Sequence, residues 1–219
     1  MTRLFRPTLA PLLAIAAALV ATPAFAGPPL LCHPYEIGTA RSLPWSGGTS
    51  WFQGDASYRT ENLVADTEAL LTPSTPVVVR METLRRAAIY ASADATLAAR
   101  LLDRFVKRAE TPGANGQPDA LQLLDAAYIA GAYREMTMLG KDSMWAPRVA
   151  GLRAALGSTK DATLIGRSIA AKPDDPGIRF AAALILSDTD RQAYREHAEK
   201  ARAGAAHDSL LARNLNHVS

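Results

Sequence analysis

Apolar residues recur at helical spacing between residues 163 and 203, and this stretch predicts the architecture of the chain. Ile165 and Ile169 stand four positions apart, and a second group follows at intervals of four and three, Ile178, Ala182 and Ile185. Each spacing places its members on one face of an α-helix. Many of the inward positions are Ala, which lets helix axes approach closely. The pattern therefore predicts thin, tightly packed antiparallel helical hairpins.

Proline and aspartate mark where these helices end and begin. The first helix is expected to end at Lys172-Pro173, because the residue before a proline is driven out of the helical region. Asp175 can cap the next helix, with Pro176 in its first turn, where a missing N–H costs nothing. The segment 188–189 (Asp-Thr) supplies the expected cap of the third helix.

The same punctuation resembles that of tetratricopeptide repeats. In that family a proline closes the second helix, a short acidic turn follows and a new helix begins, as in 172–176 (KPDDP). The run Leu121-x-x-Leu124-Asp125-x-x-Tyr128 is similar to the first helix of such a repeat, with Asp125 where the family has a small residue. The resemblance implies an α-solenoid-like (TPR-like) fold and a role in binding other proteins, and it implies no enzymatic activity.

Helical spacing predicts further elements on both sides of this stretch. Their expected starts are, in chain order, about Thr60, Thr75-Pro76, Ser92 or Asp94, about Pro118, Asp142 or Ser143, the pair Ser158 and Asp161, and Asp208. The segment 111–117 (TPGANGQ) is the clearest loop. The predicted fold class is all-α, built of antiparallel helical hairpins that form either an open solenoid or a closed bundle.

The first 26 residues have the three parts of a secretory signal peptide. Arg3 and Arg6 give a positive start, residues 11–20 are a short apolar run, and Ala24-Phe25-Ala26 is a small-x-small cleavage signal before Gly27. The apolar run is shorter than the roughly 20 residues that span a bilayer, and no second apolar segment of that length follows. We therefore expect an exported protein, periplasmic or secreted, with no membrane span after signal cleavage.

Removal of the signal segment changes the charge of the chain. The full sequence holds 24 Lys and Arg against 21 Asp and Glu, and loss of two arginines leaves 22 against 21. No block of basic residues interleaves with aromatics, so nucleic acid is not an expected partner.

The expected organisation is a signal peptide at 1–26, an arm at 27–58 and a helical-repeat-like domain at 59–219.

The arm differs in composition from the rest of the chain. It is rich in Gly, Pro, Ser and aromatic residues, and it holds two of the three tryptophans, Trp45 and Trp51. Its prolines prevent a long helix, and it is too aromatic for a disordered tail. We expect an irregular arm that packs its aromatic side chains onto the helices.

Cys32-His33 is the most suggestive pair for chemistry. Thiolate and imidazole are both metal ligands, and Cys–His pairs can form nucleophilic centres. Adjacent residues of an extended arm point to opposite faces, however, so the two side chains do not readily face each other. The alternative interpretation is a partly buried thiol beside a structural histidine. As the single cysteine of the chain, Cys32 cannot form an internal disulfide.

Three further patterns have structural explanations. They are the methionines at 136, 138 and 144, the histidines at 197, 207 and 217, and the acid pairs at 174–175 and 188–190. Methionine commonly fills irregular cores, histidines ten residues apart do not share a helix face, and acids favour helix starts. The sequence contains no serine-hydrolase, zinc-protease or nucleotide-binding motif.

Three interpretations of the function remain open from the sequence. The first is an exported, non-enzymatic helical-repeat protein that binds a protein or peptide partner along a helix-lined surface. The alternative is a small-ligand or metal-binding protein, or an enzyme, with its site where the arm meets the helices; Cys32, His33 and Tyr35 are its candidate binding residues. A third interpretation is a structural protein of the cell envelope. No catalytic residue, metal site or cofactor is assigned.

Overall fold

The computed structural model describes residues 29–46, 51–113, 116–139 and 143–218. Over these ranges the chain is all-α, as predicted, with nine α-helices, four short 3-10 helices and no β-strand. Trp45 and Gly54 form one isolated antiparallel bridge within the arm. The predicted signal peptide lies outside the described residues. No helix of the described part is both long and apolar enough to cross a membrane.

Short turns join most of the helices. The α-helices are α1 (Leu63–Leu70), α2 (Val77–Ala91), α3 (Ala95–Glu110), α4 (Ala120–Met138), α5 (Val149–Leu156), α6 (Asp161–Ala171), α7 (Pro176–Leu186), α8 (Arg191–Gly204) and α9 (Ser209–Asn214). The 3-10 helices are η1 (Thr60–Asn62), η2 (Ala146–Arg148), η3 (Ala205–His207) and η4 (Leu215–Val218).

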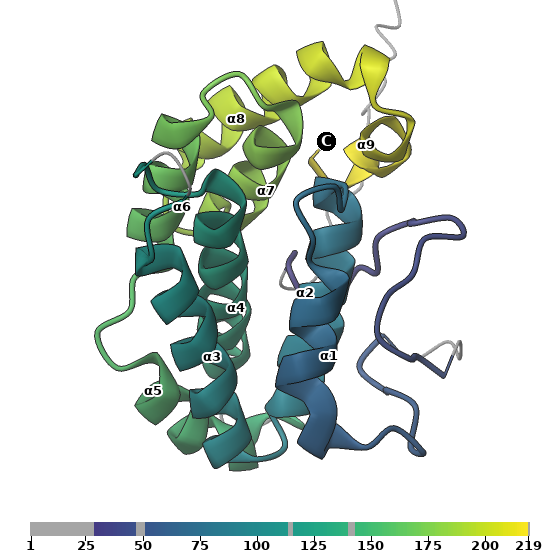
Figure 1. The fold of residues 1–219 in the computed structure, drawn as a ribbon, viewed down its shortest axis with the longest axis vertical. Helices are drawn as coiled ribbons and strands as arrows, with labels where there is room; N and C mark the ends of the chain where they lie inside the picture. The colour runs from purple at the N-terminus through teal and green to yellow at the C-terminus, as the bar shows by residue number, and fades with distance from the viewer. Residues whose placement is uncertain (1–28, 47–50, 114–115, 140–142, 219) are drawn as a thin grey trace, which may run out of the picture.

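The helices form two neighbouring groups with the arm outside one of them. Figure 1 shows α3 to α6 on the left, α1 and α2 on the right, and the arm running beside α1 and α2 at the far right. Helix α4 is central, since it packs against α2, α3, α5, α6 and α7. Helices α7 and α9 both contact α2, so the C-terminal part of the chain returns to the N-terminal helices.

Helix α4 is buried on nearly all sides. Leu124, Tyr128 and Ala132 are fully buried on one face, and Leu123 and Tyr133 are just as buried elsewhere on the helix. A helix that is apolar all round belongs to the interior of a bundle rather than to its surface.

Aspartate side chains begin five of the helices. In each, one carboxylate oxygen accepts two backbone N–H bonds of the first turn at 2.8–3.2 Å, which satisfies donors that no helical bond can reach. The capping residues are Asp94, Asp119, Asp175, Asp190 and Asp208. The predictions of Asp94, Asp175 and Asp208 as helix starts are confirmed.

Two helices begin later than predicted. Helix α2 has Pro76 as its N-cap, and the Thr75 hydroxyl donates instead to the Leu70 carbonyl at 2.8 Å, which closes the preceding turn. Helix α5 begins after Arg148, because the 3-10 helix η2 comes first. Of its two predicted caps, Ser143 is described and lies before η2, and the other lies outside the described residues.

Arg134 of α4 explains why two other predicted caps are wrong. Its guanidinium donates to Asp161 at 2.7 Å and to Asp188 at 2.8 Å. Asp161 is therefore the first residue of α6 and an ion-pair partner, not the end of a capping box begun at Ser158. Asp188 is likewise engaged by Arg134, and α8 begins after Asp190. One arginine thus ties together α4, the start of α6 and the α7–α8 turn.

Asp125 forms a buried ion pair where a tetratricopeptide repeat has a small residue. Its Oδ2 lies 2.6 Å from Arg80 Nη1, and both side chains are almost fully buried. Arg80 also donates to the Thr72 carbonyl at 2.6 Å. Burial raises the pKa of Asp125 to about 7, although the charge of Arg80 opposes this. The pair therefore links α2 to α4 in addition to the packing between these two helices.

Candidate functional site

Polar side chains of the helices bind the main chain of the arm. Residues 29–46 form neither helix nor strand, and a buried backbone group without a partner costs free energy. The Tyr128 hydroxyl donates to the Leu30 carbonyl at 2.7 Å. The Asn214 amide binds both the N–H and the carbonyl of Glu36, at 2.8 and 2.9 Å. Because these contacts are to main-chain atoms, they hold the path of the arm.

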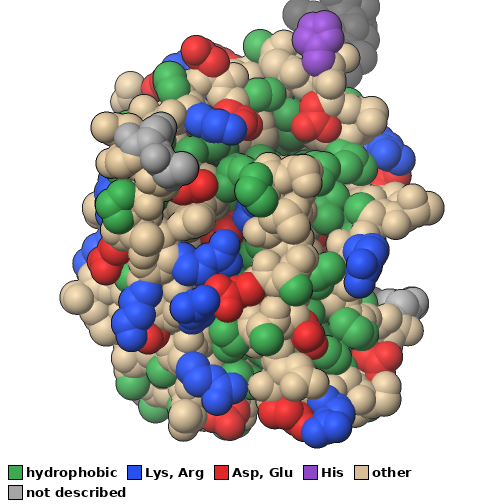
Figure 2. Space-filling view, in the orientation of Figure 1, with side chains coloured by type: hydrophobic (Ala, Val, Ile, Leu, Met, Phe, Trp, Pro, Cys, Tyr) green, Lys and Arg blue, Asp and Glu red, His purple; other side chains and the backbone are tan. Residues whose placement is uncertain are grey.

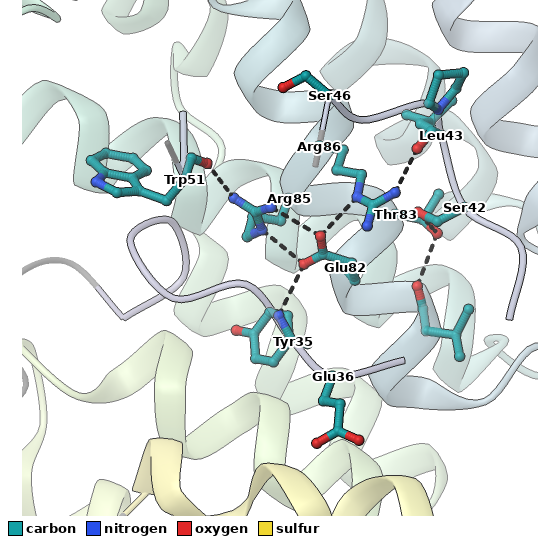
Figure 3. Close-up of polar contacts among 12 residues, drawn as sticks. Tyr35, Glu36, Ser42, Leu43, Ser46, Trp51, Glu82, Thr83, Arg85 and Arg86 are labelled. Carbon is teal, nitrogen blue, oxygen red and sulfur yellow. Dashed lines mark hydrogen bonds and ion pairs between the residues drawn. The ribbon is translucent and has the colours of Figure 1, made fainter. Parts of the chain in front are cut away.

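Glu82 of α2 is the centre of this arrangement (Figure 3). Its carboxylate accepts bonds from the Tyr35 N–H at 3.1 Å, from Arg85 at 2.8 and 2.9 Å and from Arg86 at 2.7 Å. The side chains of Glu82 and Arg85 are 1% and 0% exposed. Burial alone would raise the pKa of Glu82, but the hydrogen bonds and charges of Arg85 and Arg86 lower it below its ordinary value. The carboxylate therefore stays ionised inside the protein.

Arg85 and Tyr90 join the two halves of the arm. Their main-chain partners are Leu31 O (3.2 Å) and Trp51 O (2.7 Å) for Arg85, and Pro44 O (2.7 Å) and Asp55 N (2.7 Å) for Tyr90. Each side chain thus binds one residue before and one after the segment 47–50. The two halves are fixed to the same face of α2.

The aromatic side chains of the arm pack on the helices, as predicted. Trp45 lies edge-on to Tyr90 at 5.7 Å between ring centroids, and the Arg85 guanidinium lies 4.9 Å from the Trp45 ring. Trp51 packs at 6.1 Å from Trp145, which is itself buried. The arm also contributes apolar side chains to the same core as the helices, Leu30, Leu31, Tyr35 and Leu43.

The structure brings two of the three candidate binding residues together at His217. The Tyr35 ring stacks on His217 at 4.9 Å, and the His33 ring lies edge-on to it at 6.1 Å. The Tyr35 and Tyr128 hydroxyl oxygens are 3.2 Å apart, within hydrogen-bond distance. Cys32 is a partly buried free thiol packed against the hydrophobic core. The three residues thus take part in packing the arm against the helices.

Burial sets the charge states of Cys32, His33 and His217. It raises the pKa of the Cys32 thiol to about 11, an effect strengthened by the nearby Glu135, and it lowers the pKa of His33. It also lowers the pKa of His217, to about 4. A protonated thiol beside neutral imidazoles does not supply a thiolate nucleophile. Within the described ranges no group of three or more His, Cys, Asp or Glu side chains could hold a metal ion.

The Cys32 thiol is expected to react slowly in the folded protein. With its pKa at about 11 instead of 9.0, the thiolate fraction near pH 8 falls about a hundredfold. Alkylation by iodoacetamide, followed by mass spectrometry, should be slower by at least this factor in the folded chain than in urea. Equal rates in the two states would contradict the buried position of Cys32.

Glu135 of α4 holds the start of the arm. Its two carboxyl oxygens lie 3.1 and 3.3 Å from the Leu30 nitrogen, and burial raises its pKa well above the ordinary value. One turn earlier, a Cβ on Gly131 would lie 2.8 Å from Leu30 Cδ1. Leu30 thus sits directly against the backbone of α4 at Gly131, and a larger residue there would require the Leu30 side chain to move.

The histidines and methionines of the helices divide between core and surface. His197 is buried, with its Nδ1 3.0 Å from Arg179, as expected for a satisfied histidine. Met136 is fully buried, but Met138 and Met144 are 58% and 44% exposed. Core filling therefore explains only the first of the three methionines.

An open groove of about 900 Å³ lies at a second place, where three chain segments end together. The segments are the α1–α2 turn, the loop before α4 and the C-terminal end of α6. The lining includes Pro73, Pro118, Leu121, Arg167, Ala170 and Lys172. Sequence analysis missed this groove, because its walls come from segments far apart in the chain.

The groove is lined by basic side chains that form few ion pairs within the protein. Arg167 is exposed and has no hydrogen-bond or ion-pair partner in the described part of the chain, and Lys172 has only a 4.0 Å contact with Asp175. The one acid in the lining, Asp119, accepts two N–H bonds as the cap of α4. On the face in Figure 2, by contrast, basic side chains gather over α3 among acidic ones. There Arg104 pairs with Glu68 at 2.9 Å.

No protein-family model, curated protein or solved structure matches the chain.

Proposed function

We propose that the protein is an exported, non-enzymatic helical protein that binds an acidic, extended segment of another protein in the groove beside α6. The groove's unpaired Arg167 is the observation that carries this proposal. An exposed guanidinium without a partner can bind a carboxylate without first breaking an internal ion pair. The tetratricopeptide-like helix punctuation supports the same class of function, protein binding, and remains part of the proposal.

The shape and the charge of the groove suit such a segment. Pro73, Pro118 and Leu121 offer apolar surface for side chains of a bound chain. Arg167 and Lys172 stand on the α6 side, where carboxylates of the same segment could meet them. The contacts of Cys32, His33 and Tyr35 give less support to the alternative ligand site, since these residues serve the packing of the arm.

Peptide titration tests the proposal. Three fluorescein-labelled peptides of equal length, rich in Asp and Glu, neutral, or rich in Lys, are titrated with the protein and followed by anisotropy. The acidic peptide should bind saturably and most tightly. Arg167→Glu should weaken it by about threefold to tenfold, the range for losing and reversing one exposed charge pair.

Arg191→Glu is the matched control. Arg191 is an exposed arginine of α8 without a partner in the described chain, and it does not line the groove. The control should leave the affinity within about twofold, because net charge acts only weakly at physiological ionic strength. Equal weakening by both variants, equal affinity for the neutral peptide, or no binding at all would contradict the proposal.

A further inference from the structure

The Arg80–Asp125 ion pair connects two segments that line the groove. Arg80 Nη1 donates to Asp125 at 2.6 Å, and Arg80 Nη2 donates to the Thr72 carbonyl at 2.6 Å. Thr72 directly precedes Pro73, which lines the groove from the α1–α2 turn. Asp125 stands about one helical turn after Leu121, which lines the groove from α4. One guanidinium group therefore joins two walls of the groove.

The other hydrogen bonds of the α1–α2 turn close it on itself. The Thr72 N–H donates to the Thr75 hydroxyl at 3.0 Å, and the Thr75 N–H donates to the Thr72 carbonyl at 3.1 Å. The Thr75 hydroxyl donates to the Leu70 carbonyl at 2.8 Å. Thr72 and Pro73 are exposed, so burial contributes little to holding them in place. The bond from Arg80 is thus the contact that fixes this turn relative to α4.

Two polar atoms of the ion pair are left unsatisfied inside the protein. Arg80 Nε and Asp125 Oδ1 are buried, and neither has a hydrogen-bond partner in the described part of the chain. A buried ion pair repays its cost of desolvation only when its remaining polar atoms are also bonded. Apolar side chains of similar volume would therefore hold α2 against α4 about as well. They would not, however, supply the bond to the Thr72 carbonyl.

We infer that Arg80 and Asp125 are positioning residues of the groove: the ion pair holds the α1–α2 turn, with Pro73, in a fixed place relative to the side of α4 that carries Leu121. The inference rests on the proposed function and names the residues that keep the binding surface in shape. Neither residue needs to touch the bound segment, because the pair acts through the turn.

The double variant Arg80→Met, Asp125→Leu tests the inference, because it removes both charges and keeps apolar volume between the helices. Its urea midpoint should stay close to the wild-type value. The amide hydrogens of Thr72 and Thr75 should exchange with solvent about threefold to tenfold faster, the range for losing one hydrogen bond, while that of Tyr128 in α4 should not change. The acidic peptide should bind more weakly by a similar factor, because a loose turn must be ordered on binding.

The double variant Asp103→Leu, Lys107→Met is the matched control. It also removes one acid and one base, but this pair is exposed on α3 and does not line the groove. Both the affinity for the acidic peptide and the exchange of the turn amides should keep their wild-type values.

Arg80→Met alone carries the test if the double variant does not fold. Asp125 can then stay protonated and uncharged, because burial raises its pKa and Arg80 no longer lowers it. This variant should show the same faster exchange of the turn amides and the same weaker binding. Wild-type exchange or wild-type affinity in a folded variant would overturn this inference alone. Failure of the wild-type protein to bind the acidic peptide would instead overturn the proposed function, and the inference with it.

Discussion

Glu82→Gln is expected to lower the free energy of unfolding by about 3–5 kcal/mol, the range for breaking a buried ion pair by removing one charge. The reason is Arg85, which is fully buried and would keep its positive charge without a carboxylate beside it. The variant also weakens the bond to the Tyr35 N–H. Urea denaturation followed by circular dichroism measures the change.

Glu61→Gln is the control for this variant. Glu61 pairs with Arg59 at 2.6 Å, but both side chains are exposed, so the urea midpoint should not move measurably. Limited proteolysis adds a local readout, because Glu82→Gln should speed cutting within residues 29–46. A wild-type urea midpoint in Glu82→Gln would show that the bonds of Glu82 to Tyr35, Arg85 and Arg86 do not hold the arm.

The second large effect is a fall in stability as the pH rises above about 6.5. Burial raises the pKa of Glu135 well above 4.5 and that of Asp125 to about 7 from 3.8. Both acids therefore hold their protons to higher pH in the folded state than in the unfolded state. Where the folded state binds more protons, the free energy of unfolding falls with rising pH. The fall is about 1.4 kcal/mol per pH unit for each group that is protonated in the folded state and ionised in the unfolded state.

The histidines set the lower limit of this window. Burial lowers the pKa values of His33, His197 and His217, the last to about 4, so their contributions rise with pH and oppose the two acids below about pH 6.5. Above that pH the histidines are neutral in both states. Asp125 then adds little more, because its loss of stability is nearly complete once the pH passes its folded-state pKa of about 7. The slope between about pH 6.5 and 8.5, the range to measure, is therefore mainly that of Glu135.

Glu135→Gln should flatten this part of the profile and raise the stability at pH 8.5. The amide oxygen can still accept the bond from the Leu30 N–H, while the cost of a buried charge is removed. Two buried glutamates that both bind the arm thus respond oppositely, since Glu82 has two arginine partners and Glu135 accepts its bonds from one backbone N–H. Thermal denaturation at several pH values measures the effect. A wild-type profile without a fall, or a full fall in Glu135→Gln, would contradict this assignment.

Local signals in the sequence predicted much of the fold. Asp175-Pro176 starts α7 as expected, because a cap and a first-turn proline act within a few residues. The end of α6 before Lys172-Pro173 has the same local cause. The aromatic composition of the arm likewise predicted that it packs on the helices.

The predictions that were wrong depend on distant partners. Asp161 and Asp188 look like capping residues in the sequence, and only the fold brings them to Arg134. The spacing of Glu82 with Arg85 and Arg86 is visible as i, i+3 and i, i+4 pairs, which usually mark an exposed helix face. Here the arm covers that face. Burial by a remote segment has no local signal in the sequence.

For the candidate site too, residue types could be recognised from the sequence, but contacts with distant residues could not. Cys32 and His33 were found because their residue types carry chemistry, but their contacts with His217 and the core depend on the C-terminal end of the chain. The groove could not be predicted, since Pro73 and Arg167 come together only in the fold.

The most direct test of the groove as the binding site is a chemical-shift titration of the 15N-labelled protein with the acidic peptide. The groove proposal predicts that the amide signals of Leu121, Arg167 and Ala170 shift, while those of Cys32 and Tyr35 do not. Shifts confined to the arm would contradict the proposal and favour a ligand site around Cys32 and His33, and a spectrum without shifts would contradict binding of acidic segments by this protein.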